Sequence, residues 1–208
     1  YSTQPGMTNY QWNVSGGGTV TSGGGTGDNT VTVTWNTIGA QTVSVNYTSV
    51  DGCDAPAETV KNITVNPLPN PTITGPNTVC AGTSGNVYST EPGMSTYVWT
   101  VSAGGTITSG GSSNSATATI RWNTDGPQTV SVSYLNPTTG CTPPSATVYN
   151  VNVDPMPVPT ITGPTSVCVG STGNVYTTEA GMSNYVWTIS AGGTVTAGGS
   201  AGDASVTV

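Results

Sequence analysis

The sequence lacks histidine and phenylalanine, and its 208 residues include only one lysine, Lys61, and one arginine, Arg121. Histidine is the side chain that most often acts as a general base near neutral pH, so its absence removes the commonest route to acid–base catalysis. The net charge is −7, whereas nucleic-acid binding needs clustered lysine and arginine. We therefore do not expect nucleic acid to be a partner.

Long apolar runs are absent as well. No run approaches the ~20 apolar residues that a membrane-spanning helix needs, so we expect no membrane insertion. The sequence also has no signal-peptide pattern. Because it starts in the middle of a repeated unit, we expect the 208 residues to be a window on a longer polypeptide.

One stretch of the chain occurs three times with small changes. The copies are Tyr10–Gly24, Tyr97–Gly111 and Tyr185–Gly199, and their starting points are 87 and 88 residues apart. A period of this length is typical of a small β domain and gives about 2.4 units in the chain. The sequence therefore predicts a tandem array.

The middle copy has the pattern of a strand that buries one face. Tyr97, Trp99 and Val101 alternate with Val98 and Thr100, which is the period of two expected in a strand. The strand predicted over residues 128–134 alternates in the same way, with Tyr134 on its apolar face. The strand predicted over residues 147–153 breaks step after Val148, which indicates a β-bulge. About seven such strands predict a β-sandwich.

Aligning the copies predicts three domains. Residues 1–69 form a repeat that lacks its first strand, residues 70–157 form a complete repeat, and residues 158–208 form a repeat that lacks its last strands. The joints, Val65–Pro71 and Val153–Pro159, carry a proline at every second residue. Such joints favour a semi-rigid polyproline path, which predicts an extended rod.

Three features together resemble PKD-like domains of the immunoglobulin-like class: the Tyr-x-Trp strand, the Gly-x-Gln-Thr-Val-Ser-Val-x-Tyr strand, and the Gly-Cys loop before the last strand. The motif Pro-x-Pro-x-Ile-Thr-Gly-Pro-x-x-Val-Cys occurs twice, at Pro69–Cys80 and Pro157–Cys168. The arrangement resembles the tandem PKD-like repeats of very large secreted surface proteins of Bacteroidetes-type bacteria. This resemblance implies an all-β chain of tandem immunoglobulin-like sandwiches in an extracellular adhesin, gliding-motility protein or filament. It further implies export by a dedicated machinery such as type IX secretion.

The sequence departs from the PKD pattern in one segment. PKD domains typically read Trp-Asp-Phe-Gly-Asp-Gly, whereas the segment Trp99–Gly105 contains no acid. A calcium site attached to those acids therefore does not carry over, and we expect no metal and no cofactor.

The tryptophans Trp12, Trp99 and Trp187 allow two interpretations. They could serve as sugar-stacking platforms, but their alternation with apolar neighbours such as Tyr97 favours structural core positions. We predict a core built on these tryptophans together with Tyr97 and Tyr134, since a buried indole removes about 150–250 Å² from water.

The four cysteines, Cys53, Cys80, Cys141 and Cys168, favour disulfides over zinc, because the chain has no histidine and no C-x-x-C pair. We predict a structural disulfide between Cys80 and Cys141, which would close a loop worth about 4 kcal/mol of stability. In an immunoglobulin topology these two positions lie at opposite poles, so bonds between neighbouring units or chains remain the alternative. The partners of Cys53 and Cys168 would lie outside this sequence.

Catalysis finds little support in the acidic residues. A hydrolase with paired carboxylates needs two acids about 5–9.5 Å apart in a cleft. Two acidic positions recur between repeats, and each is replaced in a third copy: Glu91 and Glu179 by Gln4, and Asp28 and Asp203 by Ser115. We therefore expect no enzyme activity.

The function predicted from the sequence is that of a stalk or fibre in a secreted surface protein. Its partners would be the neighbouring repeats, and edge strands without lysine would permit lateral self-association into filaments. Two alternatives remain open: multivalent weak binding of glycans or matrix, or an accessory domain of a secreted hydrolase.

Overall fold

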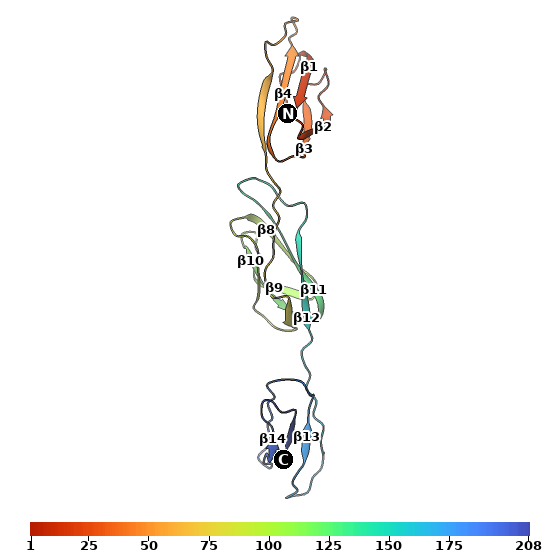
Figure 1. The fold of residues 1–208 in the computed structure, drawn as a ribbon, viewed down its shortest axis with the longest axis vertical. Helices are drawn as coiled ribbons and strands as arrows, with labels where there is room; N and C mark the ends of the chain where they lie inside the picture. The colour runs from red at the N-terminus through yellow and green to blue at the C-terminus, as the bar shows by residue number, and fades with distance from the viewer. The chain divides into compact units, whose positions relative to one another are not determined.

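The structure of the protein, a computed structural model, describes all 208 residues as strands, turns and connecting segments (Figure 1). None of its segments is a helix with the length and hydropathy needed to cross a membrane. The chain divides into two compact units, Tyr1–Asp154 and Pro155–Val208. The all-β prediction is confirmed, and the boundaries proposed for three repeats stay a prediction.

The complete repeat lies within the first unit and forms two facing sheets. One sheet has the order β7-β10-β9 and the other β6-β12-β11-β8. All pairings are antiparallel except the one between β6 and β12, the first and last strands, which is parallel. The strands are β6 (Thr78–Cys80), β7 (Asn86–Ser89), β8 (Ser95–Val101), β9 (Gly105–Gly110), β10 (Thr117–Trp122), β11 (Gly126–Leu135) and β12 (Thr147–Asp154).

Valine and aromatic side chains from both sheets fill the space between them. Tyr88, Ile120, Trp122, Val130 and Val132 are each 0% exposed. The Trp122 ring meets the Tyr88 ring edge-on, and its Nε1–H donates to the Tyr88 hydroxyl at 3.0 Å. This bond satisfies the only polar atom of the indole, so the ring can be fully buried without an unpaired donor.

The last strand contains no bulge, which corrects the sequence interpretation. Its pairing with β11 runs without a shift from Gly126 opposite Val153 to Val132 opposite Thr147. Tyr149 and Val151 lie on the same, inward face of the strand, while Val148 points outward and is 59% exposed. The apparent break in period came from assigning Val148 to the inner face.

A true irregularity lies at the start of β8. The register with β11 shifts between Ser133 and Leu135, and Thr96 has a φ of 53°. The two counterparts, Asn9 and Asn184, have φ values of 52° and 56°. Asparagine tolerates this left-handed conformation much better than the β-branched threonine does.

Residues 1–65 repeat the pattern of the complete repeat without its opening segment. The sheets have the orders β1-β4-β5 and β2-β3. The Nε1–H of Trp35 donates to the Tyr1 hydroxyl at 2.8 Å, as Trp122 does to Tyr88. The strands are β1 (Thr8–Val14), β2 (Gly18–Gly23), β3 (Val31–Trp35), β4 (Gly39–Thr48) and β5 (Thr59–Val65).

The second unit contains one small sheet. Its order is β13-β15-β14, with β13 (Val175–Thr177), β14 (Ala197–Gly198) and β15 (Ser205–Thr207). Residues 185–189, the counterparts of the β8 core positions, have no strand partner and are not part of a ladder.

Candidate functional site

The recurring polar residues of the complete repeat meet around Glu91, which lies just before β8. Its carboxylate accepts hydrogen bonds from the Thr72 backbone N–H at 3.1 Å, from the hydroxyls of Thr72 and Thr90, and from the Tyr134 hydroxyl at 3.0 Å. The Tyr97 hydroxyl donates to the Glu91 carbonyl at 2.7 Å. We call these five residues the Glu91 corner.

Hydrogen bonding determines the ionisation of Glu91. Desolvation is the largest single influence and raises its pKa, but the bonds from Thr72 and Thr90 together outweigh it and lower the pKa to about 2. The carboxylate is therefore ionised at neutral pH, and its acceptor positions are used by neighbouring donors. Such a group fastens the opening segment to β11 and is poorly suited to abstract a proton from a substrate.

The pKa of Tyr134 is shifted in the opposite direction to that of Glu91. Desolvation, together with its hydrogen bond to the ionised Glu91, raises the pKa of Tyr134 to about 12. Its ring packs edge-on against Tyr97 with centroids 5.8 Å apart. The hydroxyl thus remains a donor over the whole physiological range.

The first 65 residues build the same corner with a neutral side chain. Gln4 occupies the position of Glu91, and its Oε1 accepts from the Tyr47 hydroxyl at 2.7 Å and from the Thr3 hydroxyl at 3.1 Å. The Tyr10 hydroxyl donates to the Gln4 carbonyl at 2.7 Å. The geometry therefore does not require a carboxylate.

The second unit holds the third version of the corner. The Glu179 carboxylate accepts from the Thr160 backbone N–H at 3.1 Å and from the hydroxyls of Thr160 and Thr178. Bonds from Thr160 and then Thr178 lower the pKa of Glu179 to about 2. The Tyr185 hydroxyl donates to the Glu179 carbonyl at 2.7 Å. No tyrosine donates to the Glu179 carboxylate itself.

The predicted core tryptophans differ in burial. Trp99 is 8% exposed, whereas Trp12 and Trp187 are only half-buried. Each indole donates to a backbone carbonyl at the same distance along the chain: Trp12 to Asp28, Trp99 to Ser115 and Trp187 to Asp203, at 2.8–2.9 Å. Tyr97 and Tyr134 are each 4% exposed. The indole environment is thus set locally, while its burial depends on the strands that face it.

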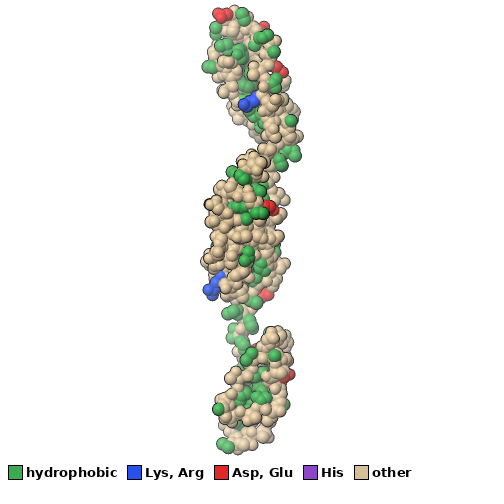
Figure 2. Space-filling view, turned by 90° about the vertical axis from the view of Figure 1, so that its left-hand side faces the viewer, with side chains coloured by type: hydrophobic (Ala, Val, Ile, Leu, Met, Phe, Trp, Pro, Cys, Tyr) green, Lys and Arg blue, Asp and Glu red, His purple; other side chains and the backbone are tan.

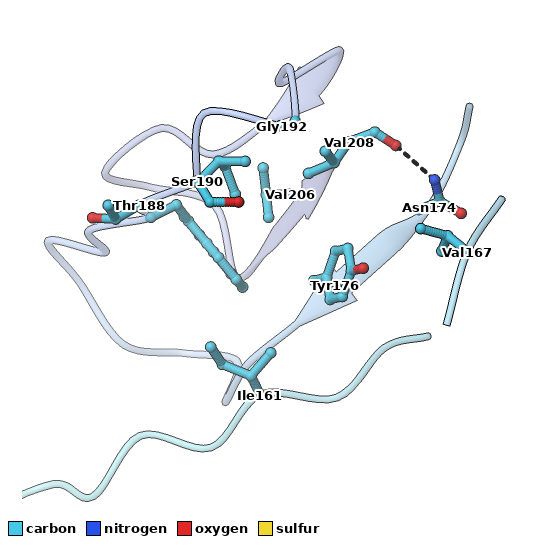
Figure 3. A pocket seen from close by; sticks show the side chains of 12 residues that line it. Ile161, Val167, Asn174, Tyr176, Thr188, Ser190, Gly192, Val206 and Val208 are labelled. Carbon is cyan, nitrogen blue, oxygen red and sulfur yellow. Dashed lines mark hydrogen bonds between the residues drawn. The ribbon is translucent and has the colours of Figure 1, made fainter. Parts of the chain in front are cut away.

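An apolar groove of about 510 Å³ lies beside Trp187 in the second unit. Figure 3 shows Ile161, Tyr176, Val206 and Val208 around it. A second groove of about 540 Å³ lies beside Trp12 in residues 1–65. Both grooves lie where the complete repeat packs further strands.

The structure does not form the predicted disulfide between Cys80 and Cys141. All four cysteines are free thiols. Cys80 lies opposite Asp154 in the β6–β12 ladder, at the end of β12 that neighbours the start of β11. Cys141 forms an isolated β-bridge with Asn136, just after the end of β11. The ten residues of β11 separate these positions by roughly 30 Å. A disulfide needs α-carbons about 4.4–6.8 Å apart, so the intradomain pair is wrong.

The structure contains no candidate metal centre. No three histidine, cysteine or acidic side chains lie close enough to hold a metal ion. Every buried side-chain nitrogen and oxygen has a hydrogen-bond partner. Figure 2 shows acidic and basic side chains only singly on the visible face. The Glu91 corner is what sequence reasoning missed. The recurrence of Glu91, Glu179 and Gln4 was visible, but Thr72 and Tyr134, which complete the corner, lie 19 and 43 residues from Glu91.

Comparison with known proteins identifies the repeat type. A family model described as the PKD-like domain matches residues 2–65, 66–152 and 154–208. No curated protein matches the chain in sequence.

Several solved structures of surface proteins are similar at low identity. Domains 4 and 5 of the S-layer protein SbsC share 15% identity, with 73% of each chain covered and a TM-score of 0.28. Domains 4–9 of SbsC share 12%, covering 100% of this chain and 35% of that one, with a TM-score of 0.31. The Escherichia coli adhesin FdeC shares 18%, covering 85% and 64%, with a TM-score of 0.32. Similarity this low says nothing about what this chain does.

Proposed function

The chain belongs to the PKD-like domain family along almost its whole length, and from this membership we propose that it is a structural repeat region, a stalk or fibre, of a secreted cell-surface protein. In this role each repeat bears load between its two ends and has no catalytic activity. An adhesin, gliding-motility protein or filament exported by type IX secretion is the finer form of the same proposal.

The parallel pairing of the first and last strands is the observation that carries the proposal. Thr78, Val79 and Cys80 of β6 lie opposite Asn152, Val153 and Asp154 of β12. Tension applied through the chain ends pulls these two strands in opposite directions along their length. The hydrogen bonds between them are then loaded together in shear, whereas opening a hairpin from its end would break them one at a time.

Side chains add further links between the opening segment and β12. The Thr147 hydroxyl donates to the Pro71 carbonyl at 2.7 Å, and the Tyr149 hydroxyl donates to the Gly75 carbonyl at 2.8 Å. Backbone bonds follow from Asn152 N–H to Asn77 and from Ala81 N–H to Asp154, both at 2.8 Å. We call this set of bonds the terminal clamp. It joins segments more than seventy residues apart in the sequence.

Single-molecule pulling on the 208-residue chain tests the proposal. Residues 66–154 should unfold in one force peak, which lengthens the chain by the contour length of that segment, roughly 300 Å, minus the end-to-end distance of the folded repeat. The double substitution Thr147→Val and Tyr149→Phe removes the two side-chain links and should lower the peak force. Thr100→Val, an exposed threonine on β8 without a side-chain hydrogen bond, is the matched control. If the repeat yields without a peak, or if the double variant and control behave alike, the load-bearing role is wrong.

The same proposal includes lateral association. Neither β7 nor β9, the edges of the three-stranded sheet, contains a charged residue, and uncharged edges permit strand-to-strand pairing. Concentrated protein should therefore form bundles in electron micrographs; dispersed single molecules at every concentration would exclude this part. A glycan array probed with the same chain distinguishes the stalk, which predicts no binding, from a multivalent glycan-binding role.

A further inference from the structure

The opening segment of the complete repeat, residues 71–80, is held by hydrogen bonds to residues that come later in the chain. Thr74 exchanges two backbone bonds of 2.9 Å with Ser89 of β7, and β6 pairs with β12 of the other sheet. Between these two pairings the Tyr88 hydroxyl donates to the Pro76 carbonyl at 2.9 Å. The opening segment therefore joins the two sheets.

The opening segment contributes little apolar surface to the core. Ile73 is its buried apolar side chain, and Val79 is only partly buried against the core. Its hydrogen bonds can be replaced by bonds to water, so few apolar contacts oppose its release. We therefore expect the segment to detach more readily than the other strands separate. The side chains of this repeat with 0% exposure all come from later residues: Tyr88, Ala118, Ile120, Trp122, Val130 and Val132.

The site that the opening segment occupies, which we call the socket, fits a narrow set of sequences. A β-carbon on Gly75 would overlap Cδ1 of the fully buried Tyr88, so the position needs glycine. The preceding Ile73 reaches the core. The five-residue run Thr-Ile-Thr-Gly-Pro occurs twice in the chain, at Thr72–Pro76 and at Thr160–Pro164. A second copy of the chain therefore carries a sequence that fits the socket.

A short turn, Ala81–Gly85, connects the opening segment to the rest of the repeat. Gly82 and Gly85 have φ values of 77° and 83°, which glycine adopts at low cost. The contacts that hold the segment all involve residues beyond this turn. When the turn opens, the same contacts can form between two chains. Short connections of this kind favour such an exchange between identical chains.

We propose that two copies of the chain exchange their opening segments, so that residues 71–80 of each copy occupy the socket of the other. Ile73 of one copy then enters the core of the second copy, and Thr72 donates to Glu91 there. The contacts are those of the single chain, so the exchanged dimer is favoured by high protein concentration. The proposal depends neither on the load-bearing role nor on pairing between the edges of β7 and β9.

Cys80 supplies a reporter of exchange, because its partner in the β6–β12 ladder is Asp154. Neighbouring strands lie about 4.8 Å apart, within the α-carbon separation of about 4.4–6.8 Å that a disulfide needs. The reporter chain carries Asp154→Cys, and its other thiols are removed by Cys53→Ser, Cys141→Ser and Cys168→Ser. Oxidised glutathione then links β6 to β12 within one chain if the segment is its own, and between two chains if it is exchanged.

Mixing two versions of the reporter chain, one with a mass tag, tests the proposal. The versions are incubated together at high concentration in urea below the midpoint of unfolding, and are then oxidised. Mixed disulfide-linked dimers should appear on non-reducing gels, and their share should rise with protein concentration. A reporter chain with Cys80→Ser and Thr100→Cys measures random collision, since Thr100 is exposed and lies opposite Ser131. The absence of mixed dimers at every concentration, or an equal share in this control, overturns the proposal.

The length of the turn distinguishes exchange from other kinds of association. Inserting Gly-Ser-Gly-Ser after Thr83 lengthens the turn and leaves the socket unchanged. Most chains should then be linked internally, because a longer connection allows each segment to return to its own socket. An unchanged share of mixed dimers would contradict exchange at this turn.

A free peptide tests the sequence that the socket accepts. The peptide Pro69–Val79, added in excess during the incubation, should compete for the socket and suppress the mixed dimers. The same peptide with Gly75→Val is the matched control and should not compete, because its side chain meets the Tyr88 ring. Equal suppression by both peptides, or none by either, would show that the socket does not bind this segment.

Discussion

The complete repeat and the first 65 residues build the same corner with different chemistry, and the difference shows which parts of the fold need charge. Glu91 accepts the hydroxyl of Tyr134 in the complete repeat, and Gln4 accepts that of Tyr47 in residues 1–65. The bonds from the tyrosines and from the preceding threonine are shared, the bonds from Thr72 have no counterpart at Gln4, and only Glu91 can titrate. The position therefore requires an acceptor, which lies 3.0 Å from the tyrosine hydroxyl at Glu91 and 2.7 Å at Gln4. Hydrogen bonds to an ionised acceptor are generally the stronger ones.

Replacing the tryptophans should give the largest difference in lost unfolding free energy between these two regions. Trp99→Ala should cost the complete repeat about 3–5 kcal/mol of unfolding free energy, because the ring is almost fully buried. Trp12→Ala should cost clearly less, since Trp12 is half-buried beside an open groove. Hydrogen exchange at the amides of β11 and β4 measures the two losses in the same chain.

A matched control for the tryptophan comparison lies in the same strand. Val98 is 56% exposed, so Val98→Ala should change stability little. Equal losses for Trp99→Ala and Trp12→Ala would show that the facing strands do not determine what the indole contributes.

Replacing the corner tyrosines, Tyr134 and Tyr47, should give a smaller difference in stability loss than replacing the tryptophans. Tyr134→Phe removes a bond to a carboxylate and should cost about 1.5–3 kcal/mol, whereas Tyr47→Phe removes a bond to a neutral amide and should cost about 0.5–1.5 kcal/mol. Urea titration followed by NMR resolves the two regions. The double change Glu91→Gln and Tyr134→Phe should lower the unfolding free energy by less than the sum of the two single changes. Fully additive losses would contradict an energetic coupling between Glu91 and Tyr134.

The left-handed residue before the aromatic strand predicts a gain of stability. Thr96→Asn should stabilise the complete repeat by about 1 kcal/mol, because asparagine adopts a φ of 53° with less strain than threonine. Asn9→Thr should destabilise residues 1–65 by a similar amount. Thermal unfolding of each variant checks the sign; a loss on Thr96→Asn would mean that the threonine is favoured by contacts outside its backbone conformation.

Lowering the pH should produce the smallest difference in stability between the complete repeat and residues 1–65, because the Glu91 corner is partly exposed to solvent. The folded pKa of Glu91 is about 2, below its ordinary value of 4.5. The stability that this group contributes is therefore present above pH 4.5 and is lost as the pH falls toward 2. The corner of Gln4 does not titrate. Hydrogen exchange between pH 5 and 2.5 should show β11 losing protection before β4, and Glu91→Gln should abolish the difference.

Local sequence patterns were sufficient for much of this architecture. The repeat period, the alternation through Tyr97 and Trp99 and the placement of Tyr134 on an apolar face all follow from spacing along one segment. A strand's period of two depends on its own residues, so it can be read before any partner is known. The all-β sandwich was predictable for this reason, and its PKD-like type was predicted from the resemblance of the repeated motifs.

The other features depend on which strands pair with one another. Only the tertiary structure decided this pairing. Strand register put Cys80 and Cys141 at opposite ends of β11, which excludes the predicted disulfide. It also brought Thr72 and Tyr134 to Glu91, and it paired the first strand with the last. These contacts join residues that lie 19 to more than 70 positions apart. Alternation along one strand carries no information about them, because pairing partners are chosen by packing across the whole sandwich.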